Sequence, residues 1–479
     1  MLSLMKKIVL GSGLLLWTSA SFAQSLPPYN PVTQERLLNP EESNWLMYRG
    51  TYDAHGYSTL DQINIENVDE LEMVWSFSTG LREGHQAPPI VNDGYMYVST
   101  PQNHIIALNA RTGDLIWRYV RFLPDDLQQL HPTNRGVALY EDRVYLATVD
   151  AYLVSLDALT GDVIWEQAVE DYYNGYYMTM APLIADGKVM VGVSGGELGI
   201  RGFVAAYDAV SGEQAWKTYT IPAPGEPGSE SWPGDSWQTG GVPVWVTGSY
   251  DPELNLVYWG TANPGPDWDS AYRPGDNLWT DSTIAIDATT GEFVWGFQHT
   301  PNDPYDYDSI AEKTLVDTQI NGKFRRAVIH ADRNGYVYAM DRVDGSYIWG
   351  TQFVDHLNWT DGLDENGRPN AYDPNVDVQL YNPGTAAHRG TTTEIGAEGT
   401  VKGALCPTHA GGKNWSPTAY NPNTNLYYIP VVEGCNRSLT IVSDPDWDPA
   451  VRQWFLGGYP FQTFADPDPA VAVSYTHLT

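Results

Sequence analysis

The chain has 479 residues and a formal net charge of −33 at pH 7. This excess of negative charge argues against nucleic-acid binding because phosphate groups would be repelled, and we attribute it to solubility rather than to steering of a basic partner. The 18 Trp and 31 Tyr suit a sheet-rich core, whereas 45 Gly and 33 Pro predict frequent turns and argue against long helices.

The N-terminus has the pattern of a cleaved secretory signal. Lys6 and Lys7 precede an apolar run, residues 8–17, and Ser21-Phe22-Ala23 precedes Gln24. The run is too short to span a bilayer comfortably. We therefore predict a signal peptide over residues 1–23, an exported chain and no stable membrane anchor.

One pattern then recurs five times: a short apolar strand, an Asn or Asp, a Gly, and a Trp four residues after that Gly. Its Gly and Trp pairs are Gly113 and Trp117, Gly161 and Trp165, Gly212 and Trp216, Gly291 and Trp295, and Gly345 and Trp349. The Asp and Gly predict a turn between antiparallel strands with a positive φ at the glycine, and the Trp can pack between sheets. The period of about 50 residues indicates four-stranded propeller blades, and the longer interval from Trp216 to Trp295 indicates an inserted loop.

Three further segments make the pattern specific. They are residues 194–202 (SGGELGIRG), residues 260–264 (GTANP) with 273–277 (RPGDN), and residues 306–308 (DYD). From about Asn44 to about Ala465 the sequence resembles the dehydrogenases that oxidise alcohols with pyrroloquinoline quinone (PQQ), and in particular the catalytic subunits of methanol dehydrogenases, including the lanthanide-dependent ones. The resemblance implies an all-β, eight-bladed propeller with tryptophan-docking motifs.

The C-terminal part departs from this family. Family members continue for another blade or two, and residues 473–479 do not resemble them. We therefore expect residues 24–472 to form an incomplete propeller domain that lacks the final blade or blades, followed by a non-native tail at 473–479.

Four oxygen-bearing side chains are candidate metal ligands: Glu197, Asn263, Asp306 and Asp308. Hard cations such as calcium prefer carboxylate and amide oxygens, although spacing alone does not show that the four converge. The resemblance implies that Glu197, Asn263 and Asp306 are ligands. Asp308 matches an additional Asp of the lanthanide-dependent relatives, so we hypothesise a lanthanide ion, with calcium as the alternative.

The resemblance also implies a set of PQQ contacts: Gln86, Arg135, Thr179, Ser194, Gly195, Gly196, Trp245, Arg333 and Asn414. Arg135 matches a residue at a PQQ carboxylate, and Trp245 matches the Trp on which the ring system stacks. Arg333 matches the basic residue beside the reactive carbonyl. Taken singly, Arg135, Trp245 and Arg333 are better explained as structural residues; within the matched set we interpret them as cofactor contacts.

Three segments depart from methanol dehydrogenases. Gln129 and Leu130 stand where the family has two adjacent cysteines covering one face of PQQ, and Gln86 stands where Glu is common. Asp267 displaces Trp268 by one residue from the family's pocket Trp. We therefore expect a differently built cover over the cofactor, and methanol, ethanol and larger alcohols all stay open as substrates.

Cys406 and Cys435 are the two cysteines of the chain. Cysteines of an exported chain can pair, and the resemblance implies that these two form a structural disulfide of the family. No CxxCH motif for covalent haem is present. A separate electron acceptor is then needed, and the resemblance implies a cytochrome c in the periplasm.

Together these features predict a periplasmic enzyme that oxidises a primary alcohol to an aldehyde by hydride transfer to PQQ. The resemblance implies that Asp306 is the general base and that Arg333 and the metal polarise the carbonyl. One alternative is a quinoprotein for larger alcohols or polyols. The other is a noncatalytic propeller scaffold of the kind that assists outer-membrane assembly.

Overall fold

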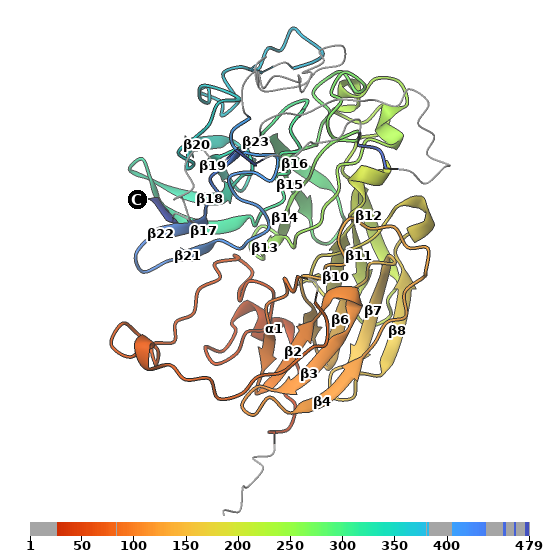
Figure 1. Ribbon diagram of the computed structural model, residues 1–479, viewed down its shortest axis with the longest axis vertical. Coiled ribbons are helices and arrows are strands. Elements are labelled where there is room, and N and C mark those ends of the chain that lie inside the picture. Colours follow the sequence, from red (N-terminus) through yellow and green to blue (C-terminus); the bar gives the residue numbers. More distant parts are fainter. Residues whose placement is uncertain are drawn as a thin grey trace, which may run out of the picture.

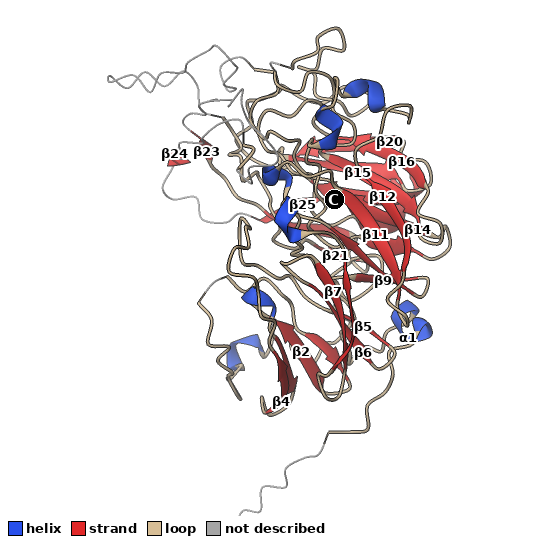
Figure 2. Cartoon of the chain, turned by 90° about the vertical axis from the view of Figure 1, so that its right-hand side faces the viewer, coloured by secondary structure: helices blue, strands red, loops and turns tan. Residues whose placement is uncertain are grey.

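The computed structural model describes residues 26–82, 84–379, 381–382, 405–436, 454–456, 464–465 and 475–478. The predicted signal peptide lies outside the described residues. Five four-stranded antiparallel sheets follow one another along the chain, each built from four consecutive strands. The sheets are arranged as blades along an arc (Figure 1), and the short helical turns lie outside the sheets (Figure 2). The predicted all-β propeller architecture is confirmed.

The first three blades span residues 90–219. Blade one consists of β1 (Ile90–Asn92), β2 (Tyr95–Ser99), β3 (Ile105–Asn109) and β4 (Leu115–Tyr119). Blade two consists of β5 (Ala138–Tyr140), β6 (Arg143–Ala147), β7 (Tyr152–Asp157) and β8 (Val163–Ala168). Blade three consists of β9 (Leu183–Ala185), β10 (Lys188–Gly192), β11 (Phe203–Asp208) and β12 (Gln214–Tyr219).

Two more complete blades and two smaller sheets follow. Blade four consists of β13 (Ser249–Asp251), β14 (Leu256–Gly260), β15 (Ser282–Asp287) and β16 (Phe293–Gln298). Blade five consists of β17 (Thr314–Ile320), β18 (Lys323–Ala331), β19 (Tyr336–Asp341) and β20 (Tyr347–Gln352). The smaller sheets pair β21 (Ala419–Asn421), β22 (Leu426–Pro430) and β25 (Tyr475–Leu478), and β23 (Cys435–Asn436) with β24 (Phe464–Ala465). The predicted total of eight blades stays a prediction.

Helical structure is sparse, as the glycine and proline content predicts. The helices are α1 (Gln34–Leu38) and the 3-10 turns η1 (Val68–Glu70), η2 (Pro101–Asn103), η3 (Tyr172–Asn174), η4 (Gly196–Leu198), η5 (Ser229–Ser231) and η6 (Ser236–Gln238). None of the helices in the described part of the chain has the length and apolar character that a membrane crossing needs. The long interval between Trp216 and Trp295 contains two extended connections, β12 to β13 and β14 to β15, so the predicted insertion is confirmed.

The burial of the strands shows which edge of each blade faces the centre of the molecule. The first strand is largely buried in all five blades, whereas the last strands β4, β8 and β20 are mostly exposed or half-buried. The first strands therefore lie on the inner side of the arc and the last strands on the outer side. Loops that precede a first strand consequently end close to the centre of the molecule.

The repeated Trp residues join neighbouring blades, as predicted. The Trp117 ring packs on Gly161, and its indole N–H donates to Ala158 O at 3.0 Å. Trp216 packs in the same way on Gly291, and Trp295 packs on Gly345. The glycines have φ between +74° and +77°, which favours a residue without a Cβ. Each Trp thus forms part of the packing between one blade and the next.

The disulfide between Cys406 and Cys435 is present, with the two Cα atoms 4.5 Å apart. It connects the segment before β21 to β23. The predicted pairing is confirmed.

Candidate active site

The predicted site residues come from two kinds of loop. Gln86, Arg135, Thr179, Trp245, Asp306, Asp308 and Asn414 lie before the first strand of a sheet, whereas Ser194, Glu197, Asn263 and Arg333 lie after a second strand. Because neighbouring strands are antiparallel, the start of the first strand and the end of the second lie at the same edge of a blade. Residues from six sheets that are distant in sequence can therefore meet at one face.

Most of them do meet, in a cavity of about 490 Å³. The predicted residues that line it are Gln86, Arg135, Thr179, Ser194, Gly195, Glu197, Trp245, Asp306, Asp308, Arg333 and Asn414. Gly196 and Asn263 do not line this cavity and lie directly behind it. A Cβ added to Gly196 would lie 2.9 Å from Pro243 Cδ and 3.2 Å from Asn263 Oδ1, so glycine permits the close approach of these loops.

One wall of the cavity combines an aromatic face with two guanidinium groups. The Arg135 Cζ lies 4.4 Å from the centroid of the Trp245 ring, and the Arg333 Cζ lies 5.5 Å from it. Arg135 Nη1 donates to Thr179 Oγ1 at 2.5 Å. Burial lowers the pKa of Arg135 to about 10, which leaves it a cation at neutral pH. This wall offers a flat surface with positive charge at its margin, suited to a planar anion.

Arg333 also contacts the acidic side of the cavity. Its Nη2 lies 2.8 Å from Asp308 Oδ2, and its Nη1 donates to the backbone oxygen of Asp306 at 2.9 Å. Although burial opposes the charged form, Asp308 and Asp306 raise the pKa of Arg333. The guanidinium is therefore held in position by both acidic residues of the DYD segment.

The carboxyl groups outnumber the cations around them. Burial raises the pKa of Glu197 to about 7, and the charge on Asp308 adds to the rise. Burial and Asp308 together raise the pKa of Asp306 well above its ordinary range, and burial also raises that of Asp308. These carboxylates repel one another across the cavity, so a bound cation would stabilise their ionised forms.

Asp267 is a site residue that the sequence did not predict, since it was expected only to displace Trp268. Asp267 is 3% exposed, and its Oδ1 accepts a 2.8 Å hydrogen bond from Asn263 Nδ2. Burial and the charges of Asp306 and Glu197 raise its pKa well above its ordinary range. Asn263 Nδ2 also donates to Pro264 O at 3.1 Å. Both contacts use the amide nitrogen of Asn263 and leave its Oδ1 available as a ligand.

The other departures have clear positions. Leu130 lines the cavity and is 47% exposed, and His131, Pro132 and Thr133 line it beside Leu130. Leu130 N–H donates to Tyr177 Oη at 3.4 Å. The cover over this side of the cavity is thus apolar Leu130 and the segment after it. Trp268 does not line the cavity; it is buried and packs edge-on against His409, with the ring centroids 5.7 Å apart.

Comparison with known proteins matches residues 45–355 to the β-propeller domain of PQQ-dependent glucose, ethanol and alcohol dehydrogenases. The quinoprotein alcohol dehydrogenase PedH of Pseudomonas putida is 39% identical over 422 residues, which are 83% of this chain and 68% of PedH. A lanthanide-dependent methanol dehydrogenase of Methylacidiphilum fumariolicum is 36% identical, over 83% of this chain and 66% of the relative. The chain thus spans about two thirds of the length of these two relatives. A solved europium-containing methanol dehydrogenase superposes with a TM-score of 0.76 at 35% identity, covering 84% of this chain and 71% of that one.

Proposed function

This chain belongs to the family of PQQ-dependent alcohol dehydrogenases, and we propose that its cavity oxidises a primary alcohol to an aldehyde. The observation that carries the proposal is the meeting of Arg135, Trp245 and Arg333 with the carboxyl groups of Asp306 and Asp308 in one cavity. An aromatic face and two cations suit a planar anionic cofactor, and a carboxylate beside it suits proton transfer. A scaffold protein would need neither feature.

The residues present fit PQQ. Arg135 Nε, Arg333 Nε and Gln86 Oε1 are buried and have no hydrogen-bond partner among the described residues. Buried polar groups are rarely left without a partner, so a ligand with carboxylate and carbonyl oxygens would satisfy the two Arg groups. When bound, PQQ supplies a quinone that accepts a hydride from the alcohol carbon. Trp245 would stack on its rings, Arg135 would bind a carboxylate, and Thr179, Ser194, Gly195, Gly196 and Asn414 would surround it.

The acidic residues fit a metal ion. Glu197, Asp306 and Asp308 would supply carboxylate oxygens and Asn263 an amide oxygen, the donor set of a hard cation. Burial is the main cause of the raised pKa values of the three carboxyl groups, and a bound cation would favour their ionised forms. We propose a lanthanide ion, with calcium as the alternative, because a trivalent ion matches three carboxylates better. The europium-containing structural neighbour supports this choice.

Asp306, Arg333 and Leu130 would then have different roles in the reaction. Asp306 accepts the hydroxyl proton of the alcohol as general base, and its ion pair with Arg333, with 3.6 Å between Oδ2 and Nη1, favours the ionised form. The Arg333 guanidinium stabilises the negative charge that develops on an oxygen in the cavity. Leu130 and the residues after it line one side of the cavity and would help to exclude water there.

The electron acceptor and the location are part of the same proposal. The resemblance to methanol dehydrogenases supports a separate cytochrome c as acceptor. The pattern of residues 1–23 supports export to the periplasm.

Dye-linked alcohol oxidation by the chain reconstituted with PQQ tests the proposal, with lanthanum, calcium or no added metal. We expect activity with lanthanum. Activity with calcium alone would keep the enzyme and overturn the lanthanide. Failure to bind PQQ under all three conditions would overturn the enzymatic function, and a panel of methanol, ethanol and larger alcohols or polyols would define the substrate.

A further inference from the structure

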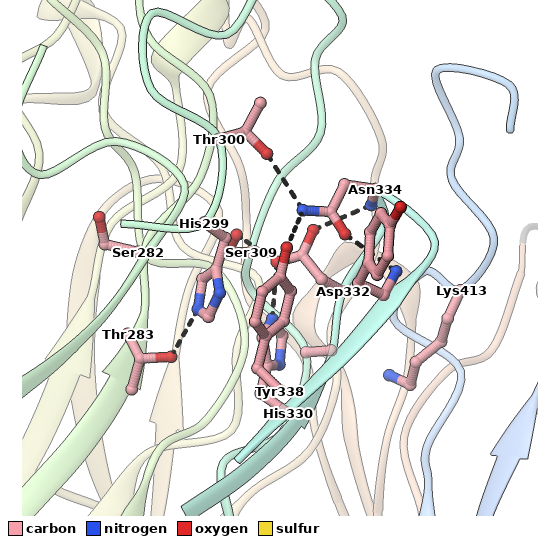
Figure 3. Close-up of polar contacts among 12 residues, drawn as sticks. Ser282, Thr283, His299, Thr300, Ser309, His330, Asp332, Asn334, Tyr338 and Lys413 are labelled. Carbon is pink, nitrogen blue, oxygen red and sulfur yellow. Dashed lines mark hydrogen bonds and ion pairs between the residues drawn. The ribbon is translucent and has the colours of Figure 1, made fainter. Parts of the chain in front are cut away.

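A buried chain of charged and polar side chains lies behind Arg333 and outside the cavity. It consists of Lys313, His330 and Asp332, each at most 1% exposed. Lys313 Nζ lies 3.0 Å from His330 Nδ1, and His330 Nε2 lies 2.9 Å from Asp332 Oδ2, a contact drawn in Figure 3. Burying a Lys and an Asp is costly unless they are paired and hydrogen-bonded. We call these three residues the Lys–His–Asp chain.

The Lys–His–Asp chain fastens together the two loops that carry the acidic residues and Arg333. Asp332 precedes Arg333, and its Oδ1 accepts from the Asn334 N–H at 2.9 Å. Its Oδ2 accepts from the hydroxyl of Ser309, the residue after Asp308. Lys313 Nζ donates to the backbone oxygen of Ser309 at 2.6 Å and to that of Ala311 at 2.9 Å. Lys313 at one end of the Lys–His–Asp chain and Asp332 at the other therefore both hold Ser309 against the turn at 332–334.

The contacts of Arg333 depend on that spacing. Its guanidinium reaches Asp306 O and Asp308 Oδ2 on one loop, and its own backbone oxygen accepts from the Gly412 N–H at 2.9 Å. Gly411 lies so close that an added Cβ would sit 2.4 Å from Arg333 Cβ. The backbone of Arg333 is thus confined on one side by glycine and on the other by Asp332. A shift between the loops would move the guanidinium relative to the cavity.

A metal site is the competing explanation of the same cluster. His299, His330 and Asp332 place one ligand atom each within 4.8 Å of one another. However, both ring nitrogens of His330 already face partners: Lys313 Nζ faces Nδ1, and Asp332 Oδ2 faces Nε2. His299 is hydrogen-bonded through Nε2 to Thr283 Oγ1 at 3.0 Å. Hydrogen bonds account for His330 and Asp332 without an ion.

We propose that Lys313, His330 and Asp332 are positioning residues for alcohol oxidation. This inference rests on the proposed function. They touch neither the cavity nor the reacting atoms, and they act by fixing Arg333 against Asp306 and Asp308. Breaking the Lys–His–Asp chain should therefore reduce the rate of the chemical step more than it weakens the binding of alcohol or cofactor.

The decisive variant is Asp332→Asn, which keeps the size of the side chain and an oxygen for the Asn334 N–H. We expect kcat to fall about 10- to 100-fold, as is usual when a partner that orients an active-site group is removed. The KM for alcohol and the Kd for PQQ, measured by fluorescence titration, should change less than about threefold. The absorption spectrum of bound PQQ should shift because Arg333 has moved.

Two variants of His330 distinguish loss of positioning from loss of folding. His330→Leu breaks both contacts, whereas His330→Gln can still donate to Asp332 and accept from Lys313. We expect the Leu variant to repeat the loss of kcat and the Gln variant to restore most of it. Thr283→Val is the matched control, because it removes a hydrogen bond to His299 in the same buried cluster without touching the Arg333 loops. It should lower thermal stability and leave kcat and the spectrum unchanged.

Two failures are distinguishable. A parent chain that binds no PQQ overturns the proposed function and this inference with it. A parent that oxidises alcohol while Asp332→Asn and His330→Leu match Thr283→Val in kcat overturns the positioning role alone. Stoichiometric zinc or another metal lost on His299→Asn would also overturn it in favour of the metal site.

Discussion

The backbone N–H of Asn263 donates to Asp308 Oδ1 at 2.7 Å, which joins two of the four proposed metal ligands directly. The other oxygen of Asp308 lies 2.8 Å from Arg333. Asp308 therefore fixes the separation between the Asn263 loop, the DYD segment and the Arg333 turn. An added carboxylate at this position contributes both charge and geometry to the proposed site.

Replacing Asp308 by Ala should weaken the binding of a trivalent ion more than that of calcium. Removing one carboxylate lowers the charge of the donor set and frees the Asn263 loop, and we expect lanthanide affinity to fall about 10- to 100-fold. Europium luminescence titration of the PQQ-loaded chain would measure the change. Glu292→Ala removes an exposed carboxylate and serves as the control. Equal losses for both ions would contradict a special role in lanthanide binding.

Asp306→Asn should abolish the proposed general base while leaving the cavity intact. The amide cannot accept the hydroxyl proton, so kcat should fall about 10²- to 10⁴-fold. Steady-state dye reduction would give kcat, and metal content by mass spectrometry would show whether the ion is still bound. Normal turnover with metal bound would mean that another group is the base.

Asp267 provides a separate test of how Asn263 is held. Asp267→Leu removes the acceptor of the 2.8 Å bond from Asn263 Nδ2, so the amide can rotate and present nitrogen instead of oxygen. We expect weaker metal binding, about 10-fold in affinity, as for other residues that orient a ligand. Asp267→Asn keeps an oxygen acceptor and should bind metal nearly as well as the parent. Identical titrations for the two variants would show that orientation of Asn263 does not depend on Asp267.

Blade structure was readable from the sequence because its signals are local. The glycine turn, the Trp after it and the two flanking strands are close in sequence; in blade two they all lie within residues 152–168. The same register shift recurs next to the turn in all five blades. The resemblance likewise placed most cavity residues, because each occupies an equivalent loop before a first strand or after a second one.

The sequence could not show contacts made between distant segments. Asp267 looked like an insertion because its partner, the amide of Asn263, is defined only once the chain bends back on itself. Lys313, His330 and Asp332 carried no motif of their own, since their role depends on Ser309 and Arg333 being brought together across two loops. The number of blades is set by sheet-to-sheet packing around the whole ring and did not follow from five repeats.

The disulfide should stabilise the chain without taking part in the chemistry. Cys406 and Cys435 are separated by 29 residues, and closing such a loop contributes about 3 to 4 kcal/mol by the chain-entropy estimate. We expect the double variant Cys406→Ser and Cys435→Ser to lose about that much unfolding free energy in urea titrations. A reductant should destabilise the parent to a similar extent and leave the double variant unchanged. Destabilisation of both by reductant would point to another cause.

Two glycines allow the Trp docking to be separated from backbone strain. Gly291 has φ +77° and supports the Trp216 ring, so an added Cβ would lie 2.6 Å from Trp216 Cδ2; Gly322 has φ +72° and nothing within 4 Å. Alanine should cost about 1 to 2 kcal/mol at either position through the left-handed backbone alone. At Gly291 it should cost about 1 to 3 kcal/mol more, because Trp216 is displaced from between the blades. Urea unfolding of Gly291→Ala and Gly322→Ala measures both values, and equal losses would show that Trp216 packing adds nothing to blade-to-blade stability.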